Sequence, residues 1–319
     1  MKEKIAVLMG GRSLEREVSL ASGQHVSAAL EALGYYVLAL DVTADLVQTL
    51  RSERPDAAYI ALHGKFGEDG TIQELLEFLG IAYTGPGVVA SALAWDKSVA
   101  KHLFAANDIP TPAWVTLTAD AFKEMGAATA LDLVGETVGG YPVAVKPSRQ
   151  GSALGLRKVD SAAGLADALL DALSYDTSAL VERWIDGTEV AITVLGDGAG
   201  LEVLPAVEIA PRTGVYDFSA RMATDGVDFF VPARIAPEVA ARATEVARRT
   251  HELLGCRDVS RVDLVIAEDG TPYVLECNTS PGMTETSLLP MAAEAADMSF
   301  QDVISRVIRA ALDRGDSGT

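Results

Sequence analysis

The stretch RVDLVIAEDGTPYVLECNTSPGMT, residues 261–284, contains two apolar runs that meet at Asp269-Gly270. This dipeptide is typical of a two-residue type I′ turn, because both central residues of that turn need positive φ. Two short apolar runs on either side of such a turn are typical of paired antiparallel strands. The stretch therefore predicts a β-hairpin in which Asp269 and Gly270 form the loop.

The predicted register of this hairpin places four polar side chains on one face. With a two-residue loop, Asp263 lies opposite Glu276, and Arg261 lies opposite Asn278. Two directly opposed carboxylates destabilise a strand pair, so a cation between them is the natural remedy, and carboxylate and amide oxygens suit Mg²⁺. We therefore expect a metal site at Asp263, Glu276 and Asn278. The alternatives are a solvated strand face on which Arg261 pairs with the acids, and an odd-length loop that would scatter the set.

A metal ion with only two or three protein ligands usually shares its other positions with substrate phosphates and water. The segment VAVKPSRQGSALG supplies Lys146 at a strand end, followed by Gly151, Ser152 and Gly155. The backbone N–H groups of such a loop can approach phosphate oxygens closely. The segment is interpreted as a phosphate-binding loop, with an ordinary flexible hairpin as the alternative. Neither GxxxxGK[ST] nor GxGxxG occurs, so the fingerprints of P-loop kinases and of standard dinucleotide folds are missing.

Strand-like and helix-like segments alternate along the N-terminal part of the chain. KIAVLMGG, YYVLALDV and DAAYIALHG are apolar runs, and helical patterns such as VSLASGQHVSAALEALG separate them. This alternation predicts an α/β fold with a parallel sheet and right-handed crossovers. The first domain is expected to end near AWDKSVA.

Length and composition restrict the function further. A chain of 319 residues suggests two or three domains. It has no apolar run of about 18 residues and no signal-peptide pattern, which predicts a cytoplasmic protein without a membrane span. Two cysteines, Cys256 and Cys277, are too few for a disulfide framework and lack metal-site spacing. A net charge of -19 argues against nucleic acid as a partner, although local lysines and a metal can still hold a small phosphate ligand.

Three further polar segments are ambiguous by themselves. In MGGRSLEREVSL, Glu15 precedes a helix, where an acid favours the helix dipole. In ALHGKFGEDGT, His63 stands beside a Gly-rich loop, and a lone histidine is more often structural. WIDGTE is either a plain turn with Glu182 and Glu189 solvated or the border of an adenosine pocket.

Taken together, these segments resemble the D-alanine–D-alanine ligases of the ATP-grasp superfamily. The resemblance rests on MGGRSLEREVSL, ALHGKFGEDGT, YTGPGVVASALAWDK, VKPSRQGS, RVDLV and LECNTSPGMT, which occur in order over nearly the whole chain. It implies an α/β (α+β) fold of three domains. These are a Rossmann-like N-terminal substrate domain over 1–97, a central ATP-grasp domain over 98–188 and a C-terminal catalytic domain over 189–319, with ATP between the last two.

The resemblance also implies a reaction. In that family, the carboxylate of one D-alanine attacks the γ-phosphate of ATP to give an acylphosphate, and the amine of a second D-alanine then displaces phosphate. The product, D-alanyl-D-alanine, is a precursor of peptidoglycan. Because two anions meet in the first step, the site must neutralise charge. A homodimer in the cytoplasm is implied as well.

Each site residue takes a role by this resemblance. The ATP residues are Lys97 and Lys146 at the phosphates, Glu182 and Glu189 at the adenine and ribose, and Gly151 and Ala153 in the phosphate loop. Two Mg²⁺ ions, or Mn²⁺, would be held by Asp263, Glu276 and Asn278. The catalytic residues are Glu15, which would bind the first ammonium group, Ser152, whose loop covers the γ-phosphate, and Arg261 with the Gly282 N–H group, which would stabilise the tetrahedral oxyanion. The substrate residues are His63 near Glu15, Ser287 and Leu288 at the second carboxylate, and Arg221 and Met222 on a closing loop.

The chain departs from the family pattern at three of these positions. The family commonly has lysine and then tyrosine where this chain has Arg221 and Met222, and it commonly has serine where this chain has Ala153. Met222 removes a phenol that normally hydrogen-bonds to residues matching Ser152 and Glu15. The change is either neutral, with water restoring the hydrogen bonds, or it alters the choice of second substrate.

Other functions remain open alongside the ligation of two D-alanines. A related ATP-grasp ligase would take D-lactate, D-serine or another D-amino acid as its second substrate, in a specialised or resistance pathway. A regulatory ATP-binding module without turnover would be expected to lose Arg261 or an acid of the metal site, and none is lost. An oxidoreductase would need the dinucleotide fingerprint that is missing here.

Overall fold

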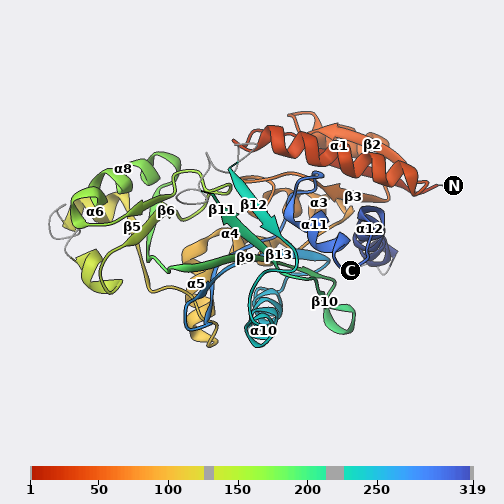
Figure 1. Cartoon of the computed structure of the whole chain (residues 1–319). Coiled ribbons are helices and arrows are strands. Elements are labelled where there is room, and N and C mark those ends of the chain that lie inside the picture. The colour runs from red at the N-terminus through yellow and green to blue at the C-terminus, as the bar shows by residue number, and fades with distance from the viewer. Residues whose placement is uncertain (1, 126–132, 213–225, 317–319) are drawn as a thin grey trace.

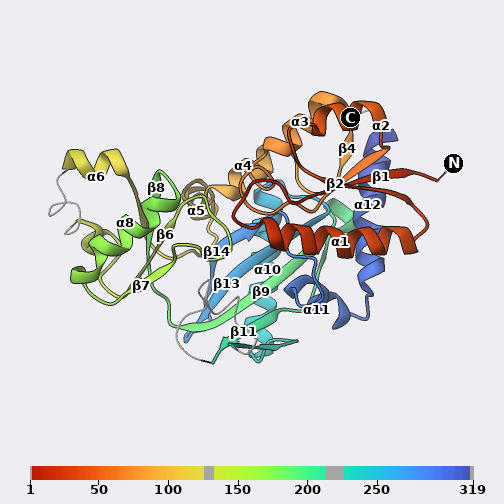
Figure 2. The same cartoon turned by 90° about the horizontal axis from the view of Figure 1, so that it is seen from above.

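The computed structural model describes residues 2–125, 133–212 and 226–316, and these residues contain three β-sheets. Their strand orders are β2-β1-β3-β4, β5-β8-β6-β7 and β12-β11-β9-β13-β14, with β10 paired to β9. Figures 1 and 2 show the second sheet at one end of the molecule, the first at the other end and the third between them. The expected α/β class is confirmed.

The first sheet is parallel and is covered by helices on both faces. Its elements are β1 Lys4–Met9, α1 Arg16–Ala32, β2 Tyr36–Asp41, α2 Leu46–Glu53, β3 Ala57–Ile60, α3 Thr71–Leu79 and β4 Ala82–Tyr83. Residues 5–8 of the central strand β1 are fully buried, as expected of a parallel strand between two helical layers. One core joins this sheet to α1 and the C-terminal helix, and another joins it to α2 and α3. The alternation of strands and helices and the parallel sheet predicted for this region are confirmed.

The second sheet is antiparallel and packs against α8. Its elements are β5 Trp114–Thr118, α6 Ala119–Met125, β6 Val143–Pro147, β7 Arg157–Val159, the 3₁₀ turn Ala162–Gly164, α8 Leu165–Tyr175 and β8 Ser178–Arg183. Strands β6 and β7 are an antiparallel pair, and the Gly-rich loop connects them.

The third sheet is also antiparallel, and α10, α4 and α5 contribute to its apolar core. Its strands are β9 Gly187–Leu195, β10 Glu202–Val203, β11 Val207–Pro211, β12 Val227–Phe230, β13 Val259–Ala267 and β14 Pro272–Asn278. The remaining elements are α4 Val88–Trp95, α5 Lys97–Ala106, the 3₁₀ turn Gly198–Gly200, α10 Pro237–Leu253, α11 Leu288–Glu294 and α12 Phe300–Asp316.

The hairpin of β13 and β14 has the predicted pairs at its polar end but not the predicted loop. Asp263 pairs with Glu276, and Arg261 pairs with Asn278. However, Ala267 is hydrogen-bonded to Thr271, so the loop has three residues and ends at Gly270 with φ +79°. The two-residue type I′ turn was therefore a wrong prediction.

A β-bulge explains why the polar pairs are nevertheless correct. A loop of odd length shifts the register by one residue. The register shifts back between Asp263 and Leu264, because Leu275 is an extra residue between the partners of these two. The loop and the bulge therefore compensate each other, and the polar side chains stay on one face.

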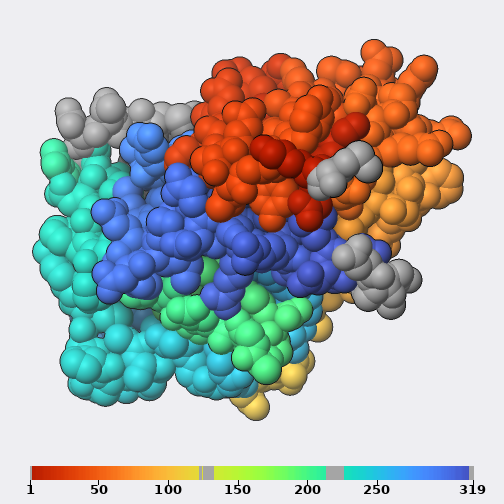
Figure 3. Space-filling view, turned by 90° about the vertical axis from the view of Figure 1, so that its right-hand side faces the viewer, coloured from red at the N-terminus to blue at the C-terminus, as the bar shows by residue number. Residues whose placement is uncertain are grey.

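The C-terminal segment connects the first and third sheets. Figure 3 shows it, in blue, between the N-terminal residues in orange and the third-sheet residues in green and cyan. Arg314 of α12 forms an ion pair of 2.6 Å with buried Asp258, which also accepts a hydrogen bond from Gly85 N. The domain boundaries at 97 and 188 stay a prediction. Across the described ranges, every helix is too short or too polar to cross a membrane.

Candidate functional site

Two neighbouring cavities lie where the second and third sheets meet. The larger, of about 310 Å³, is lined by the segment that joins β8 to β9 and by β11. The smaller, of about 70 Å³, is lined by the Gly-rich loop and by Asp263 and Glu276 of the hairpin. Lys146 and Glu189 line both cavities. The structure thus brings together the predicted phosphate loop, the predicted metal acids and the segment predicted to border adenosine.

The polar face of the hairpin is buried rather than solvated. The Nε and NH2 groups of Arg261 each donate to one oxygen of Asp263 at 2.7 Å, and Asn278 Nδ2 donates to Asp263 Oδ2 at 3.0 Å. Arg261 is 8% exposed and Asp263 is 4% exposed. Arg261 does pair with an acid, but the solvated strand face is a wrong interpretation.

Glu276 faces the small cavity together with Asp263. Its Oε2 atom lies 3.1 Å from the Nζ atom of Lys97, which is the first residue of α5. Two carboxylates and the amide of Asn278 form a set of hard oxygen donors on adjacent strands, which fits Mg²⁺ or Mn²⁺. This donor set is small enough to leave coordination positions for phosphate and water.

The Gly-rich loop adopts a strained backbone beside these acids. Ser152 and Ala153 have φ of +52° and +54°, values that residues other than glycine seldom adopt. Strain of this kind is common at ligand-binding sites. A Cβ atom on Gly151 would lie 2.7 Å from Glu15 Oε2, so a larger residue there would displace the Glu15 carboxylate. The contacts of this loop argue against the ordinary flexible hairpin.

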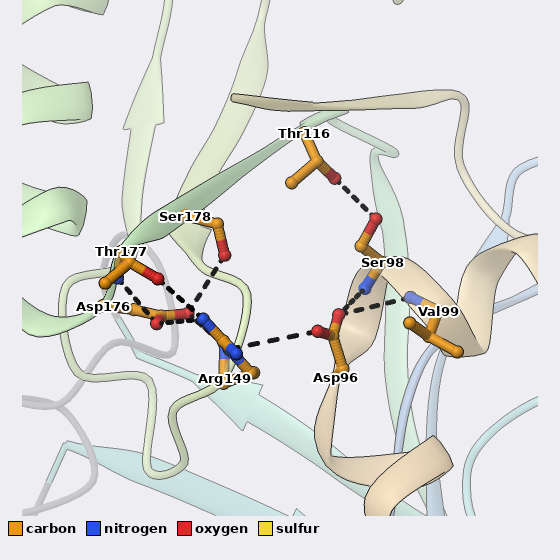
Figure 4. Close-up of polar contacts among 8 residues, drawn as sticks. All are labelled: Asp96, Ser98, Val99, Thr116, Arg149, Asp176, Thr177 and Ser178. Atoms are coloured by element: carbon orange, nitrogen blue, oxygen red, sulfur yellow. Dashed lines mark hydrogen bonds and ion pairs between the residues drawn. The ribbon is translucent and has the colours of Figure 1, made fainter. Parts of the chain in front are cut away.

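A cluster around Arg149 fixes the base of the loop (Figure 4). Its NH2 group donates to Asp176 Oδ1 at 2.9 Å and to Thr177 Oγ1 at 2.8 Å. On its other side, Arg149 Nε lies 3.9 Å from Asp96, the N-cap residue of α5, whose Oδ1 atom accepts from Ser98 N. The cluster therefore holds the loop in register with the helix that carries Lys97.

Glu182 is buried between two lysines. Lys146 Nζ lies 2.5 Å from Glu182 Oε1, and Lys101 Nζ lies 2.8 Å from Oε2. Burial raises the pKa of Glu182, but the two ammonium groups outweigh it and lower the pKa below its usual value. Because burial disfavours the charged form of a lysine, it lowers the pKa of Lys101 to about 8. Burial also lowers the pKa of Lys146, but Glu182 and Glu276 raise it above its usual value.

Glu15 lies beside the Gly-rich loop, 137 residues away in sequence. The hydroxyl of Ser152 donates to Glu15 Oε1. Glu15 is the N-cap residue of α1, but its side chain makes no capping hydrogen bond to the helix.

His63 lies near Glu15 and is 5% exposed. Its Nδ1 atom is 3.0 Å from the carbonyl oxygen of Ser280, and Nε2 is 2.9 Å from Ser22 Oγ. Because a carbonyl only accepts, Nδ1 carries the proton and Nε2 accepts from Ser22. Burial lowers the pKa of His63 to about 4, so the ring is neutral at physiological pH.

The predicted second-substrate residues follow the hairpin. Ser287 is the N-cap residue of α11, whose first residue is Leu288. A Cβ atom on Gly282 would lie 2.7 Å from Ser287 Oγ, so these two residues are immediate neighbours. Arg221 and Met222 lie outside the described residues.

Sequence reasoning missed Glu68, Lys101 and Arg149. Glu68 is 8% exposed, and its Oε2 atom accepts from Gly64 N at 2.6 Å. It lines a small cavity with Lys97 and Glu276. Burial, and then the charge of Glu15, raises the pKa of Glu68 to about 8. Its place inside the Gly-rich segment ALHGKFGEDGT was the only available signal.

The raised pKa of Glu68 predicts a specific pH dependence of stability. Between pH 4.5 and about 8, the unfolded chain releases a proton that the folded protein keeps at this carboxyl. The free energy of unfolding therefore falls as pH rises, by up to about 1.4 kcal/mol per pH unit. Glu68→Gln removes this effect, so its thermal midpoint relative to wild type should rise from pH 5 to pH 8. The exposed control Glu31→Gln should show the same pH dependence of the thermal midpoint as wild type. If Glu68→Gln also showed the wild-type pH dependence, the raised pKa of Glu68 would be refuted.

Comparison with known proteins agrees with this geometry. The family model described as D-ala D-ala ligase C-terminus matches residues 103–309, and the model described as D-ala D-ala ligase N-terminus matches residues 46–86. A D-alanine–D-alanine ligase of Pelotomaculum thermopropionicum is 44% identical over 314 residues, which are 98% of this chain and 98% of that protein. The one of Moorella thermoacetica is 43% identical over 314 residues, 97% of this chain and 99% of that protein.

Solved structures of ligases from the same family are also similar to this chain. The D-alanine–D-alanine ligase of Bacillus anthracis complexed with ATP superposes with a TM-score of 0.81 at 28% identity, covering 99% of this chain and 100% of that chain. The VanG D-Ala:D-Ser ligase of Enterococcus faecalis superposes with a TM-score of 0.79 at 29% identity, covering 97% of this chain and 99% of that chain.

Proposed function

The chain belongs to the D-alanine–D-alanine ligase family, and we propose from its cleft that it uses ATP to join two D-alanines into D-alanyl-D-alanine for peptidoglycan synthesis. The observation that carries this proposal is the convergence of Lys97, Lys146 and the Gly-rich loop with Asp263 and Glu276 around one cavity. This arrangement suits a phosphoryl transfer, in which positioning and charge neutralisation provide most of the catalysis. The ATP-grasp fold of the family agrees with it.

ATP would lie between the central domain, 98–188, and the C-terminal domain, 189–319. The 310 Å³ cavity has the size and the mixed lining expected for an adenosine. Glu182 and Glu189 line it and would bind the adenine and the ribose. Lys146 lines both cavities and would reach the phosphates together with Lys97, beneath the loop of Gly151, Ser152 and Ala153.

Two Mg²⁺ ions, or Mn²⁺, would be held by Asp263, Glu276 and Asn278. The donor set supports this, because it consists of two carboxylates and an amide. When bound, such ions neutralise phosphate charge and orient the transferred group.

Glu15, His63 and Ser152 would hold the first D-alanine. The Glu15 carboxylate would bind the ammonium group, and the short contact between Ser152 and Glu15 would keep the loop over the γ-phosphate. The carboxylate of this D-alanine attacks the γ-phosphate, forms an acylphosphate and releases ADP. His63, whose pKa burial lowers to about 4, would border the substrate as a neutral ring near pH 7.

The second D-alanine would be held at the start of α11, with its carboxylate at Ser287 and Leu288. Its amine attacks the acyl carbon, and phosphate leaves with the bonding electron pair. Arg261 and the Gly282 N–H group would stabilise the oxyanion formed in between. Arg221 and Met222 would belong to the same substrate region by resemblance alone.

The proposal is tested by incubating the protein with ATP, Mg²⁺ and D-alanine and by measuring released phosphate and product mass. We expect one D-alanyl-D-alanine per phosphate. D-lactate and D-serine, offered in competition across pH, test the alternative second substrates, for which the described residues give no support. Phosphate release that is independent of D-alanine would contradict the proposal.

We also propose that the protein is a cytoplasmic homodimer that associates through the α2–α3 surface. This surface is a groove of about 620 Å³ with a largely apolar lining that includes Phe78, which is 86% exposed, and Phe66, which is 47% exposed. Exposed apolar surfaces of this kind usually mark interaction sites. A twofold axis through this surface would bring two copies of the same apolar lining together, so that each exposed Phe78 packs against the partner's groove.

Phe78→Glu is therefore expected to convert the dimer into a monomer, because it places a charge in each groove. Light scattering coupled to size-exclusion chromatography measures the mass. Leu170→Glu is the matched control, since Leu170 on α8 is 62% exposed and far from this surface in the chain. An unchanged mass for Phe78→Glu would exclude this surface as the interface.

A further inference from the structure

Lys101 is the one fully buried lysine in the described part of the chain. It lies on α5, one helical turn after Lys97, and its side chain is 0% exposed. Its Nζ atom lies 2.5 Å from Thr111 Oγ1, 3.2 Å from the Pro112 carbonyl oxygen and 2.8 Å from Glu182 Oε2. The ammonium group thus donates two hydrogen bonds, to Thr111 and Pro112, and forms an ion pair with the Glu182 carboxylate.

Lys146 differs from Lys101 although both pair with Glu182. The Lys146 side chain is 11% exposed and lines both cavities, whereas Lys101 lines neither. Of these two lysines, only Lys146 can therefore reach a bound nucleotide. To do so, its ammonium group must turn from Glu182 toward phosphate.

The buried carboxylate of Glu182 sets the condition for this movement. Its side chain is 3% exposed, and a buried charge without a counter-ion is costly. If Lys146 were its only partner, Glu182 would compete with the nucleotide for that ammonium group. With Lys101 fixed at 2.8 Å, Glu182 keeps a counter-ion when Lys146 leaves.

The surroundings of Lys101 also hold it in place. Thr111 Oγ1, which accepts from Lys101, donates to the carbonyl oxygen of Val274 on β14 at 2.8 Å. The Trp114 ring lies 5.4 Å from Lys101 Nζ. The ammonium group is thus anchored to the strand that carries Glu276 and to the edge of the second sheet.

We infer that Lys101 is a positioning residue, the permanent counter-ion of Glu182, which frees Lys146 to bind the nucleotide. This inference rests on the ATP site proposed above. Lys101 touches no substrate in this arrangement; it acts through Glu182 and Lys146.

The test is the variant Lys101→Met, which keeps the apolar stem and removes the charge. The KM for ATP should rise by about tenfold or more, because Lys146 is then held by Glu182. The kcat at saturating ATP should change by less than about threefold, and the KM for D-alanine should stay the same. A lysine that only stabilised the fold would lower the active fraction and leave the KM for ATP unchanged. Lys4→Met, which removes a surface lysine of the first sheet, is the control for net charge.

The double variant Lys101→Met/Glu182→Gln removes both buried charges and keeps the test valid if Lys101→Met folds poorly. Compared with Glu182→Gln alone, it should show the same KM for ATP within about twofold, because Lys146 is already free. A much higher KM for ATP in the double variant, or an unchanged one in Lys101→Met, would overturn the inference. An inactive wild type would instead contradict the proposed ligase function, so the two failures are distinguishable.

Discussion

Replacing Arg261 by alanine should lower kcat by about 10²- to 10³-fold, the usual effect of removing an oxyanion-stabilising donor. Arg261 is buried on the polar face of the hairpin, and both of its hydrogen bonds to Asp263 are 2.7 Å long. It is thereby fixed next to the acids where the γ-phosphate is proposed to lie. Steady-state kinetics at saturating ATP and D-alanine measures the loss.

Stability must be measured in parallel with this turnover. Removing one partner of a buried ion pair costs about 3–5 kcal/mol, because Asp263 is left without its guanidinium. Near-UV circular dichroism and thermal unfolding at the assay temperature show whether the variant is folded. Arg261→Lys keeps the charge but loses the paired donors, so an intermediate kcat is expected. A folded alanine variant within about tenfold of wild-type turnover would remove Arg261 from the reaction.

The second large effect is expected for Glu276→Gln. This change keeps the shape of the side chain but removes one of the two hairpin carboxylates, Asp263 and Glu276, that line the small cavity. The Mg²⁺ concentration for half-maximal activity should rise by at least about 10- to 100-fold, since even indirect partners of a metal have effects of this size. Activity is measured against Mg²⁺ concentration at fixed ATP. With Mn²⁺, the variant is also expected to need a higher metal concentration than wild type.

A matched control separates this effect from the loss of any surface acid. Glu202 is a half-exposed carboxylate of the same sheet, paired with Arg306. Glu202→Gln should leave the Mg²⁺ dependence unchanged. If Glu276→Gln also left it unchanged, Glu276 would not be a metal ligand.

The hairpin shows how far the sequence could predict this site. The pairs Asp263–Glu276 and Arg261–Asn278 were predicted from a two-residue loop, but the loop has three residues and a bulge at Leu275 restores the register. Alternating strands and helices were sufficient for the parallel sheet, because the pattern of buried residues fixes that architecture. The bulge depends on packing against the neighbouring strand, which the local sequence does not report.

Residues that act through distant partners could not be predicted. Lys101 is recognisable only by its burial against Glu182, 81 residues later, and Arg149 only by Asp176 and Asp96 on other elements. The role of Glu15 came from the resemblance alone, and its contact with Ser152 joins residues far apart in sequence. Local sequence patterns thus predict helices, strands and loops, whereas ion pairs between distant elements can be identified only once the three-dimensional structure is known.

The central claim is that this cleft activates a D-alanine carboxylate by transferring the γ-phosphate of ATP to it. D-alanine with both carboxylate oxygens replaced by ¹⁸O tests this most directly, with mass analysis of the released phosphate and of the nucleotide. Each phosphate should carry one ¹⁸O atom, because the attacking oxygen leaves with phosphate when the peptide bond forms. Unlabelled phosphate, or ¹⁸O in AMP, would contradict the account.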